Sequence, residues 1–330
     1  MHDSFTLLIA VIVLAVIFDF INGFHDTANA IATSVSTRVL SPRMAVGMAA
    51  VLNLLGALSG TAVAKTVGAG IVEAGSVSQL TVAAALLSAI VWDLITWYLG
   101  LPTSSSHAIL ASLVGAAIAT SGTGVIIKVG VYKVLFALIF SPVVGLLLGC
   151  GIMLLLMNIF KNWAPYAVNK TFNKLQIVSA AYMAFSHGNN DAQKTMGIIT
   201  MALVSYYNLP DFHVPFWVIL ICAFAMAMGT AAGGWRIIKT LGVRLVHLKP
   251  IHGFAAETAA ATIIEAASRF GLPLSTTHVI SSTIMGVGSA KRLSAVRWAL
   301  GGNIVMAWIL TIPACVALAW GITTFAQRMV

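Results

Sequence analysis

Charged residues are scarce in this chain, and their scarcity excludes the soluble classes of protein. Only 8% of its 330 residues are Asp, Glu, Lys or Arg, whereas about 25% is usual in a soluble domain. Hydrophobic residues make up 59% of the sequence, and the mean hydropathy is +0.98. The net charge of +9 would suggest a nucleic-acid partner in a soluble protein, but in a membrane protein it indicates basic cytoplasmic loops. The composition therefore predicts a membrane protein that binds no nucleic acid.

Cysteine is also rare, and the three residues present, Cys150, Cys222 and Cys315, all lie in apolar runs. An odd number at irregular spacing predicts neither a disulfide framework nor a metal cluster. We expect no cofactor other than bound sodium ions. The N-terminus lacks a basic segment and a cleavage site, so residues 6–20 are expected to form a first membrane helix. The sequence shows no ATP-binding motif, so a pump would need another subunit.

What the sequence does contain is a series of apolar runs, at residues 4–35, 44–64, 81–99, 107–120, 133–157, 177–204, 214–233, 252–270, 278–288 and 298–325. Most of them approach the length of about 20 residues that crosses a bilayer. Two are too short, since residues 107–120 span about 21 Å of helix and residues 278–288 about 16 Å. Each short run follows an uncharged Pro-Ser/Thr-His motif. We therefore expect re-entrant hairpins over residues 81–120 and 252–288, with irregular backbone held inside the protein.

A polar motif interrupts two of the apolar runs. Residues 22–30 read Asn-Gly-Phe-His-Asp-Thr-Ala-Asn-Ala, and residues 187–195 read His-Gly-Asn-Asn-Asp-Ala-Gln-Lys-Thr. Asp191 follows Asp26 by 165 positions in these matched segments. Corresponding interruptions in two halves of a membrane protein are typical of a transporter site.

A second motif is also doubled. Residues 102–107 read Pro-Thr-Ser-Ser-Ser-His, and residues 273–278, 171 positions later, read Pro-Leu-Ser-Thr-Thr-His. We name these segments the first and the second hairpin tip. Two motifs that recur in the same order at nearly the same spacing predict an internal repeat of about half the chain.

The repeat predicts the domain organisation: a first membrane repeat at residues 1–157, a cytoplasmic linker at 158–176 and a second membrane repeat at 177–330. With the N-terminus outside and both hairpins returning to their own side, twelve basic residues lie inside and four outside, as the positive-inside rule requires. Each half then crosses three times, so the second half enters from the opposite side. We expect an all-α polytopic membrane protein of two inverted-topology repeats with broken helices and re-entrant hairpins. This topology places Met1, Ser76, Asn208 and Val330 outside, and Pro42, Asn169 and Leu245 inside.

Asp26 and Asp191 are predicted to lie at membrane depth, where an unpaired ionisable group is costly and marks a functional site. Gly23 and Gly188 would let the helix break, so that each aspartate stands at the N-terminus of the segment that follows. Carboxylate and amide oxygens beside unwound backbone suit a sodium ion or a proton. The residues predicted to couple a cation are Asp26, Asp191, Asn22, Asn29 and Asn190, with sodium at Asp26, Asn29 and Asp191. The alternative is that both aspartates only cap the arms of kinked helices.

The hairpin tips supply hydroxyl groups where helices are predicted to begin. Free backbone N–H groups and the positive end of the helix dipole make such a position an anion site. The alternative is that these hydroxyls only cap their helices. Lys194 either contacts the anion or neutralises Asp191, three residues earlier. The residues predicted to bind the anion are Ser104, Ser105, Ser106, Ser275, Thr276, Thr277, Gln193 and Lys194.

Other ionisable side chains in the apolar runs are less easily assigned. The doubled motifs contain four histidines, His25, His107, His187 and His278. They could serve as ligands or proton carriers. We interpret each of them instead as a hydrogen-bonded side chain that packs beside the site. Glu265 and Arg269 are one helical turn apart and are expected to form a structural pair. Glu257 has no neighbouring cation in the sequence, and Asp93 is another buried carboxylate candidate.

At these residues the chain resembles the inorganic phosphate transporter (PiT) family in its bacterial form. The signature Gly-x-x-Asp-x-x-Asn-Ala begins at Gly23, the signature Gly-Asn-Asn-Asp-Ala-Gln-Lys begins at Gly188, and both hairpin tips match Pro-x-Ser-[Ser/Thr]-[Ser/Thr]-His. The resemblance covers nearly the whole chain. It implies import of phosphate across the cytoplasmic (inner) membrane by symport with sodium or a proton, inverted repeats, both termini outside and commonly a homodimer. Lys194 stands where the first half has Asn29, so the ion stoichiometry is not transferred.

A secondary transporter for phosphate is the function that the sequence favours. A protonated phosphate can donate a hydrogen bond to a carboxylate such as Asp26, which favours phosphate over sulfate, the substrate of other permeases with this fold. An intramembrane metal-dependent enzyme would need a nucleophile–base pair or three metal ligands at a definable spacing, and the sequence shows neither. A channel is disfavoured because broken helices with carboxylates in both halves are typical of alternating access. We therefore expect no enzymatic activity.

Overall fold

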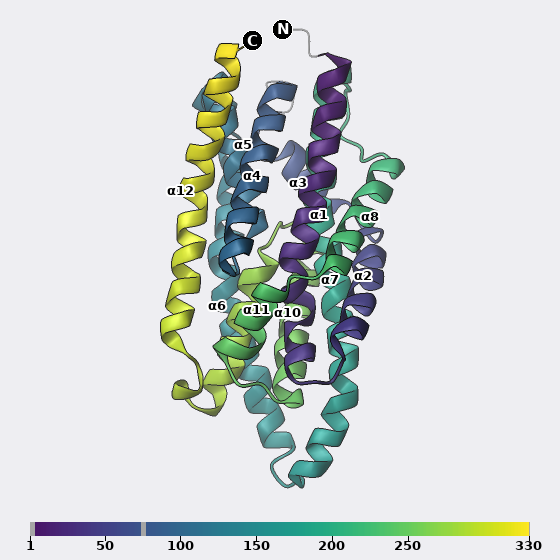
Figure 1. Ribbon diagram of the computed structural model, residues 1–330, viewed down its shortest axis with the longest axis vertical. Coiled ribbons are helices and arrows are strands. Elements are labelled where there is room, and N and C mark those ends of the chain that lie inside the picture. Colours follow the sequence, from purple (N-terminus) through teal and green to yellow (C-terminus); the bar gives the residue numbers. More distant parts are fainter. Residues whose placement is uncertain (1–3, 74–76, 330) are drawn as a thin grey trace.

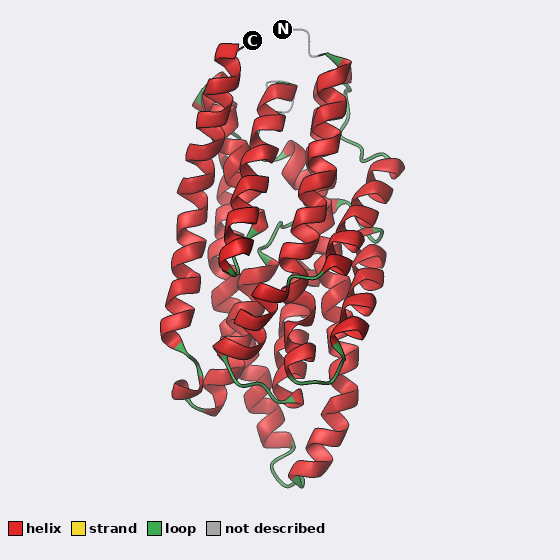
Figure 2. Ribbon diagram, viewed as in Figure 1, coloured by secondary structure: helices red, strands yellow, loops and turns green. Residues whose placement is uncertain are grey.

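The computed structural model describes residues 4–73 and 77–329, and the regular elements within these ranges are helices (Figure 2). The predicted all-α class is confirmed. The topology predictions made for Met1, Ser76 and Val330 lie outside the described residues.

The helices form two sets that repeat each other in order (Figure 1). The first set is α1 (Phe5–Ser36), α2 (Pro42–Ala57), α3 (Ala62–Ala69), α4 (Gln79–Leu99), α5 (Ser105–Ser121), η2 (Thr123–Val125) and α6 (Lys128–Ile159). The second set is α7 (Pro165–Tyr207), α8 (Phe216–Ala232), α9 (Trp235–Lys239), η3 (Thr240–Leu245), α10 (Pro250–Arg269), α11 (Thr276–Lys291), η4 (Leu293–Ala295) and α12 (Trp298–Met329). The match extends to detail, since α6 and α12 each have 32 residues and each contains one internal proline, Pro142 or Pro313.

The two sets are inverted with respect to each other. The start of α1 and the end of α12 lie at one end of the molecule, and the turn between α6 and α7 lies at the other (Figure 1). The first set therefore runs from one end to the other, and the second set runs back, as the odd number of predicted crossings requires. The described connection between the sets is short, at residues 160–164, so most of the predicted linker 158–176 belongs to helices α6 and α7.

Four helices, α1, α4, α6 and α12, are long and apolar enough to cross a membrane, judged by length and composition among the described residues. Two further spans are possible if each bent helix pair counts as one. The first pair is α2 with α3, bent by 71°, and the second is α8 with the helical segment 235–245, bent by 59°. The predicted run 44–64 is therefore a bent segment and not one straight helix.

Both predicted re-entrant hairpins are present. The hairpin of α4 and α5 lies in the half of the molecule where α1 starts and α12 ends. The hairpin of α10 and α11 lies in the opposite half (Figure 1). Each hairpin turns at a glycine with a left-handed backbone, Gly100 or Gly271, both at φ +67°. Residues without this freedom would be strained there, because a Cβ disfavours positive φ. The two hairpin tips therefore approach the middle of the molecule from opposite ends.

The prediction that the helices break at Gly23 and Gly188 is wrong. Helices α1 and α7 run without a break through these glycines, so Asp26 and Asp191 are not helix caps. The glycines instead allow close contact between helices of opposite repeats. A Cβ at Gly23 would lie 2.5 Å from the carbonyl oxygen of Met226 on α8, and one at Gly188 would lie 2.2 Å from that of Asn53 on α2. Small residues of this kind let membrane helices pack closely, and the breaks of the fold lie instead between α2 and α3 and between α8 and α9.

The two repeats interlock across the whole molecule. Helix α1 packs on α8 and α7 packs on α2, while α6 packs on α11 and α12 packs on α5. Each of the two buried apolar clusters accordingly contains side chains from both repeats. This exchange brings the middle of α1, the middle of α7 and both hairpin tips into one region.

Candidate functional site

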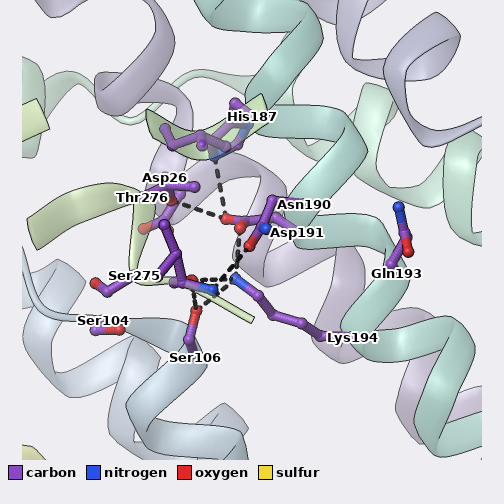
Figure 3. A network of polar contacts seen from close by, with 12 residues as sticks. Asp26, Ser104, Ser106, His187, Asn190, Asp191, Gln193, Lys194, Ser275 and Thr276 are labelled. Atoms are coloured by element: carbon purple, nitrogen blue, oxygen red, sulfur yellow. Dashed lines mark hydrogen bonds and ion pairs between the residues drawn. The ribbon is translucent and has the colours of Figure 1, made fainter. Parts of the chain in front are cut away.

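The two aspartates lie against the second hairpin tip (Figure 3). Thr276 donates a hydrogen bond from Oγ1 to Asp191 Oδ2 at 3.0 Å, and Thr277 donates from Oγ1 to Asp26 Oδ2 at 3.4 Å. Both carboxylates are buried, with 3% of Asp26 and 1% of Asp191 exposed. The structure thus brings the duplicated aspartates and the second hairpin tip together.

Asn29 completes the contacts of this tip. Its side-chain amide donates to Thr277 Oγ1 at 2.9 Å and to Thr276 Oγ1 at 3.2 Å. Each threonine hydroxyl therefore accepts from Asn29 and donates to an aspartate, which orients both hydroxyl groups. The Asn29 side-chain oxygen has no hydrogen-bond partner among the described residues, so it is free to approach a cation.

Lys194 connects the second repeat with the first hairpin tip. Its ammonium group lies 2.5 Å from Asp191 Oδ1, donates to the Leu274 carbonyl oxygen at 2.9 Å and donates to Ser106 Oγ (Figure 3). Ser106 in turn donates to the Leu274 carbonyl oxygen at 2.8 Å, so the two hairpin tips are in direct contact. Lys194 is thus placed to neutralise Asp191 and contacts both hairpin tips.

Both hairpin tips end in helix N-termini that are capped in the same way. Ser104 Oγ accepts from the backbone N–H of His107 at 3.1 Å, and Ser275 Oγ accepts from that of His278 at 3.2 Å. The remaining first-turn N–H groups of α5 and α11 and their dipoles make the region between the tips positive. Apart from the Asp93 carboxylate, the buried Ser105 hydroxyl has no hydrogen-bond partner within the described ranges. The structure therefore assigns capping to Ser104 and Ser275, and leaves Ser105 available for a ligand.

The residue before each aspartate anchors the hairpin of its own repeat. His25 lies 2.7 Å from Asp26 Oδ1 through Nδ1 and 3.2 Å from Thr96 Oγ1 through Nε2, and so joins α1 to α4. Asn190 donates to Ser268 Oγ at 2.8 Å and accepts from the backbone N–H of Leu274 at 3.2 Å. Both side-chain ends of Asn190 are thus occupied, which makes it a positioning residue for the second tip in this conformation.

Carboxylate oxygens of the two repeats lie close to each other in this cluster. One ligand atom each of Asp26, Asp191 and His187 lie within 4.8 Å of one another, and all three side chains are buried. Sodium is a hard cation that prefers oxygen ligands, so the two carboxylates suit it better than the imidazole does. The side-chain oxygens of Asn22 and Asn29 are also buried and without hydrogen-bond partners in the described part of the chain. Oxygen ligands of the kind that sodium takes therefore gather at Asp26 and Asp191.

Gln193 does not join this cluster and points to another part of the molecule (Figure 3). Its side-chain oxygen accepts from the backbone N–H of Val63 at 2.7 Å and of Ala64 at 3.4 Å. These N–H groups lie in the first turn of α3, just after the bend of the α2–α3 pair, and so have no partner within that helix. Gln193 thus caps the N-terminus of α3, the second helix of the bent α2–α3 pair. Its neighbour in the sequence, Lys194, makes entirely different contacts.

The remaining motif histidines pack beside the site. The rings of His107 and His278, which are equivalent in the two repeats, contact each other edge-to-face with centroids 4.5 Å apart. His278 also stacks on Trp308 with centroids 3.9 Å apart. His187 Nδ1 lies 3.0 Å from Asn53 Oδ1, and its Nε2 lies 3.3 Å from Asp191 Oδ2. The packing interpretation describes His107 and His278, whereas His25 and His187 touch the aspartates.

Sequence reasoning missed Asp19, a buried carboxylate on α1 two turns before Asp26. Thr195, next to Lys194, donates to Asp19 Oδ1 at 3.0 Å. An acidic residue inside the apolar run 4–35 is the signal that could have revealed it.

Glu257, which the sequence left unassigned, is fully buried among neutral donors. Thr33 donates to it at 2.5 Å, Gln176 donates at 3.1 Å, and Ser179 also donates. Among the described residues, Lys194 is the lysine or arginine whose side chain is buried. The buried carboxylates are those of Asp19, Asp26, Asp93, Asp191 and Glu257. Buried carboxylates therefore outnumber buried lysine and arginine side chains in the described part of the chain.

Comparison with known proteins agrees with the geometry. A model of the phosphate transporter family matches residues 22–167 and 160–319. A probable low-affinity inorganic phosphate transporter of Rhizobium meliloti is 47% identical over 329 residues, which are 99% of this chain and 98% of that protein. A protein of the same description from Bacillus subtilis is 46% identical and covers 98% of each chain.

A solved structure, described as the sodium-dependent phosphate transporter, has the same fold. It superposes with a TM-score of 0.89 and 25% sequence identity, over 98% of this chain and all of the other. The resemblance inferred from the two signatures and the hairpin tips is therefore confirmed, and the chain belongs to the phosphate transporter family.

Proposed function

We propose that this protein is a secondary active transporter that imports inorganic phosphate across the cytoplasmic membrane by symport with a sodium ion or a proton. The observation that carries the proposal is the meeting of two aspartates from opposite repeats with both hairpin tips and Lys194 in one buried cluster. The named relatives and the sodium-dependent structural neighbour support the same substrate.

The anion site lies between the two hairpin tips. The ammonium group of Lys194, the Ser105 hydroxyl and the first-turn N–H groups of α5 and α11 are donors that an oxyanion can accept from. Thr276 and Thr277 would turn their hydroxyl protons from the aspartates toward the anion. A protonated phosphate can donate to a carboxylate such as Asp191, whereas a fully ionised sulfate cannot. This difference in donors favours phosphate over sulfate.

The cation site lies beside the anion site, at Asp26, Asp191 and Asn29. A net charge that moves across the membrane costs about 2.3 kcal/mol per 100 mV, so a multivalent anion accumulates in a negative interior only with accompanying cations. Two carboxylates and one ammonium group leave the empty cluster with excess negative charge. A cation bound there lowers the repulsion between the carboxylates and an incoming anion, which couples the two substrates.

The inverted arrangement supports alternating access to this cluster. The α4–α5 hairpin reaches it from one end of the molecule and the α10–α11 hairpin reaches it from the other (Figure 1). Movement of one hairpin relative to the other helices opens the cluster to one side while the opposite hairpin keeps it closed. Both termini outside and a homodimeric assembly are further parts of the proposal.

Uptake into proteoliposomes tests this function. Purified protein is reconstituted, and uptake of labelled phosphate and labelled sulfate is measured under an imposed sodium gradient, an imposed proton gradient, both or neither. We expect phosphate to accumulate against its gradient when one of the cations is supplied. Accumulation of sulfate in preference to phosphate would assign the protein to sulfate, and phosphate equilibration that neither cation gradient drives would contradict symport.

A further inference from the structure

Asp93 on α4 is a buried charge that the proposed transport site does not use. It is fully inaccessible to solvent. Apart from the Ser105 hydroxyl, neither of its carboxylate oxygens has a hydrogen-bond partner among the described residues. A buried carboxylate with a single hydroxyl donor and no cation is unfavourable in its ionised form. We therefore expect this carboxylate to bind a ligand. The smallest ligand that removes its charge is a proton.

The equivalent hairpin of the second repeat carries no carboxylate at the position that corresponds to Asp93. An offset of 171 positions relates the two hairpin tips and also the two left-handed glycines, Gly100 and Gly271. The same offset places Ile264 of α10 at the position of Asp93, and Ile264 is also fully buried. An apolar side chain thus fills the equivalent place, which argues against a purely structural role for the carboxylate of Asp93.

Ser105, the first residue of α5, faces Asp93 across the hairpin. Its hydroxyl is likewise buried, it interacts with the Asp93 carboxylate, and it has no other hydrogen-bond partner in the described residues. The titratable groups within electrostatic reach of Asp93 are His25 and Asp26 on α1 and Cys315 on α12. The Asp93 carboxylate and the Ser105 hydroxyl therefore have only each other as hydrogen-bond partners among the described residues, at the edge of the proposed anion site.

We propose that Asp93 is a proton-binding group that sets the direction of the Ser105 hydroxyl and so controls the donors offered by the first hairpin tip. An ionised carboxylate only accepts hydrogen bonds, so it turns the single Ser105 proton toward itself and away from the anion. A proton taken up by Asp93 forms a carboxylic acid O–H, which donates to Ser105 Oγ. The Ser105 proton then points to the anion.

This arrangement links protonation of Asp93 to anion binding. The protonated form offers the anion one more donor and removes one negative charge from its surroundings. Linkage is reciprocal, so the proton strengthens anion binding by the same factor as the anion strengthens proton binding. The inference rests on the proposed function, because it takes the first hairpin tip as part of a phosphate site.

The test compares wild-type protein with Asp93→Asn in proteoliposomes, with phosphate uptake measured across a range of pH at a fixed sodium concentration. The asparagine amide donates to Ser105 at every pH and so imitates the protonated acid. We expect the ratio of the wild-type KM to the variant KM to be close to one at low pH and to rise about tenfold at high pH, the size of one hydrogen bond to a charged group. The titration of phosphate itself affects both proteins equally and cancels in this ratio.

Two further variants keep the test decisive. Asp93→Ile copies Ile264 of the other hairpin, and its KM relative to Asp93→Asn should not change with pH. In a Ser105→Ala background, the effect of Asp93→Asn on the pH profile should be smaller, since only the loss of the negative charge remains and the hydroxyl is absent. A KM ratio that is constant with pH would overturn the inference, and so would an undiminished effect of Asp93→Asn without the Ser105 hydroxyl.

Two other outcomes are separable. A difference between wild-type and Asp93→Asn that follows the sodium concentration and not the pH would mean that Asp93 binds sodium, which contradicts the proton assignment. Absence of phosphate uptake by the wild-type protein would contradict the proposed function itself. Uptake by the wild type with an unchanged pH profile in the variant would contradict only the role of Asp93.

Discussion

Asp26 and Asp191 belong to opposite repeats, yet their carboxylates accept hydrogen bonds from neighbouring threonines of a single hairpin tip. Thr277 binds the first aspartate and Thr276 binds the second. The first hairpin tip is held differently, since its Ser106 accepts from Lys194 and its Ser105 faces Asp93. Lys194 also donates to the Leu274 carbonyl oxygen of the second tip, so one ammonium group joins both tips.

Replacement of Asp26 or Asp191 by asparagine should abolish accumulation of phosphate against its gradient. The substitution keeps the size and one carbonyl oxygen but removes the charge that a cation neutralises. Gradient-driven uptake in proteoliposomes measures the effect, and equilibrium binding shows whether the anion still binds. Asp211→Asn, at an exposed position in the chain between α7 and α8, is the matched control and should transport normally. Concentrative uptake by both site variants would mean that the aspartates do not couple the cation.

Replacement of Thr276 by alanine should weaken phosphate transport, whereas serine at this position should largely preserve it. The hydroxyl bonds to Asp191 and to Asn29, and it is proposed to turn toward the anion. A hydrogen bond to a charged group contributes about 1.5–3 kcal/mol, which corresponds to about ten- to hundredfold in apparent affinity. The control is Thr262→Ala on the exposed side of the same hairpin. An unchanged KM in Thr276→Ala would place the anion elsewhere.

Loss of the Lys194 ammonium group should destabilise the protein strongly. Lys194→Met leaves Asp191 buried and unpaired by lysine, which costs about 3–5 kcal/mol. Thermal unfolding in detergent should show a lower midpoint, and Asp191→Asn added to Lys194→Met should restore much of it without restoring transport. Arg269→Met is the control, because Arg269 pairs with Glu265 at a side chain that is 75% exposed. Such an exposed pair is worth about 1 kcal/mol or less.

A methyl group at Gly188 should separate α7 from α2. The new Cβ in Gly188→Ala would meet the Asn53 carbonyl oxygen at 2.2 Å, and an overpacked contact of this kind costs about 1–3 kcal/mol. Gly47→Ala on α2 is the control, since no atom lies within 4 Å of its added Cβ. That control should leave the thermal midpoint unchanged or raise it, because alanine favours helix over glycine by about 0.5–1 kcal/mol. Equal midpoints for both variants would argue against glycine-mediated packing.

The orientation in the membrane can be tested with single cysteines and an impermeant thiol reagent. In a Cys150→Ser background, cysteines at Asn169 and Asn208 should react from opposite faces of sealed vesicles, with Asn169 inside the cell. Both positions are exposed. Leu245, predicted as a cytoplasmic marker, is fully buried and unsuitable, whereas nearby Val243 is 61% exposed. Reaction of Asn169 and Asn208 from the same face would contradict the inverted topology.

The sequence by itself determined the repeated organisation, both hairpins and the identity of the two central aspartates. Each of these depends on local pattern: an apolar run too short to cross a bilayer, a doubled motif, or a charge within an apolar segment. Such signals survive in the sequence because the bilayer penalises every unpaired polar group in the same way.

Only the tertiary structure decided what the motif glycines and several motif polar groups do. In the sequence, a glycine such as Gly23 or Gly188 is compatible both with a break in the helix and with close packing of two helices. Which of the two occurs depends on residues far away in the sequence, Met226 and Asn53, whose backbones lie against these glycines. Residues that are adjacent in the sequence also have different partners. Lys194 contacts the hairpin tips, whereas Gln193 caps the N-terminus of α3. Successive residues of a helix point about 100° apart, so neighbours in one motif meet different partners, and the packing of the other repeat selects those partners.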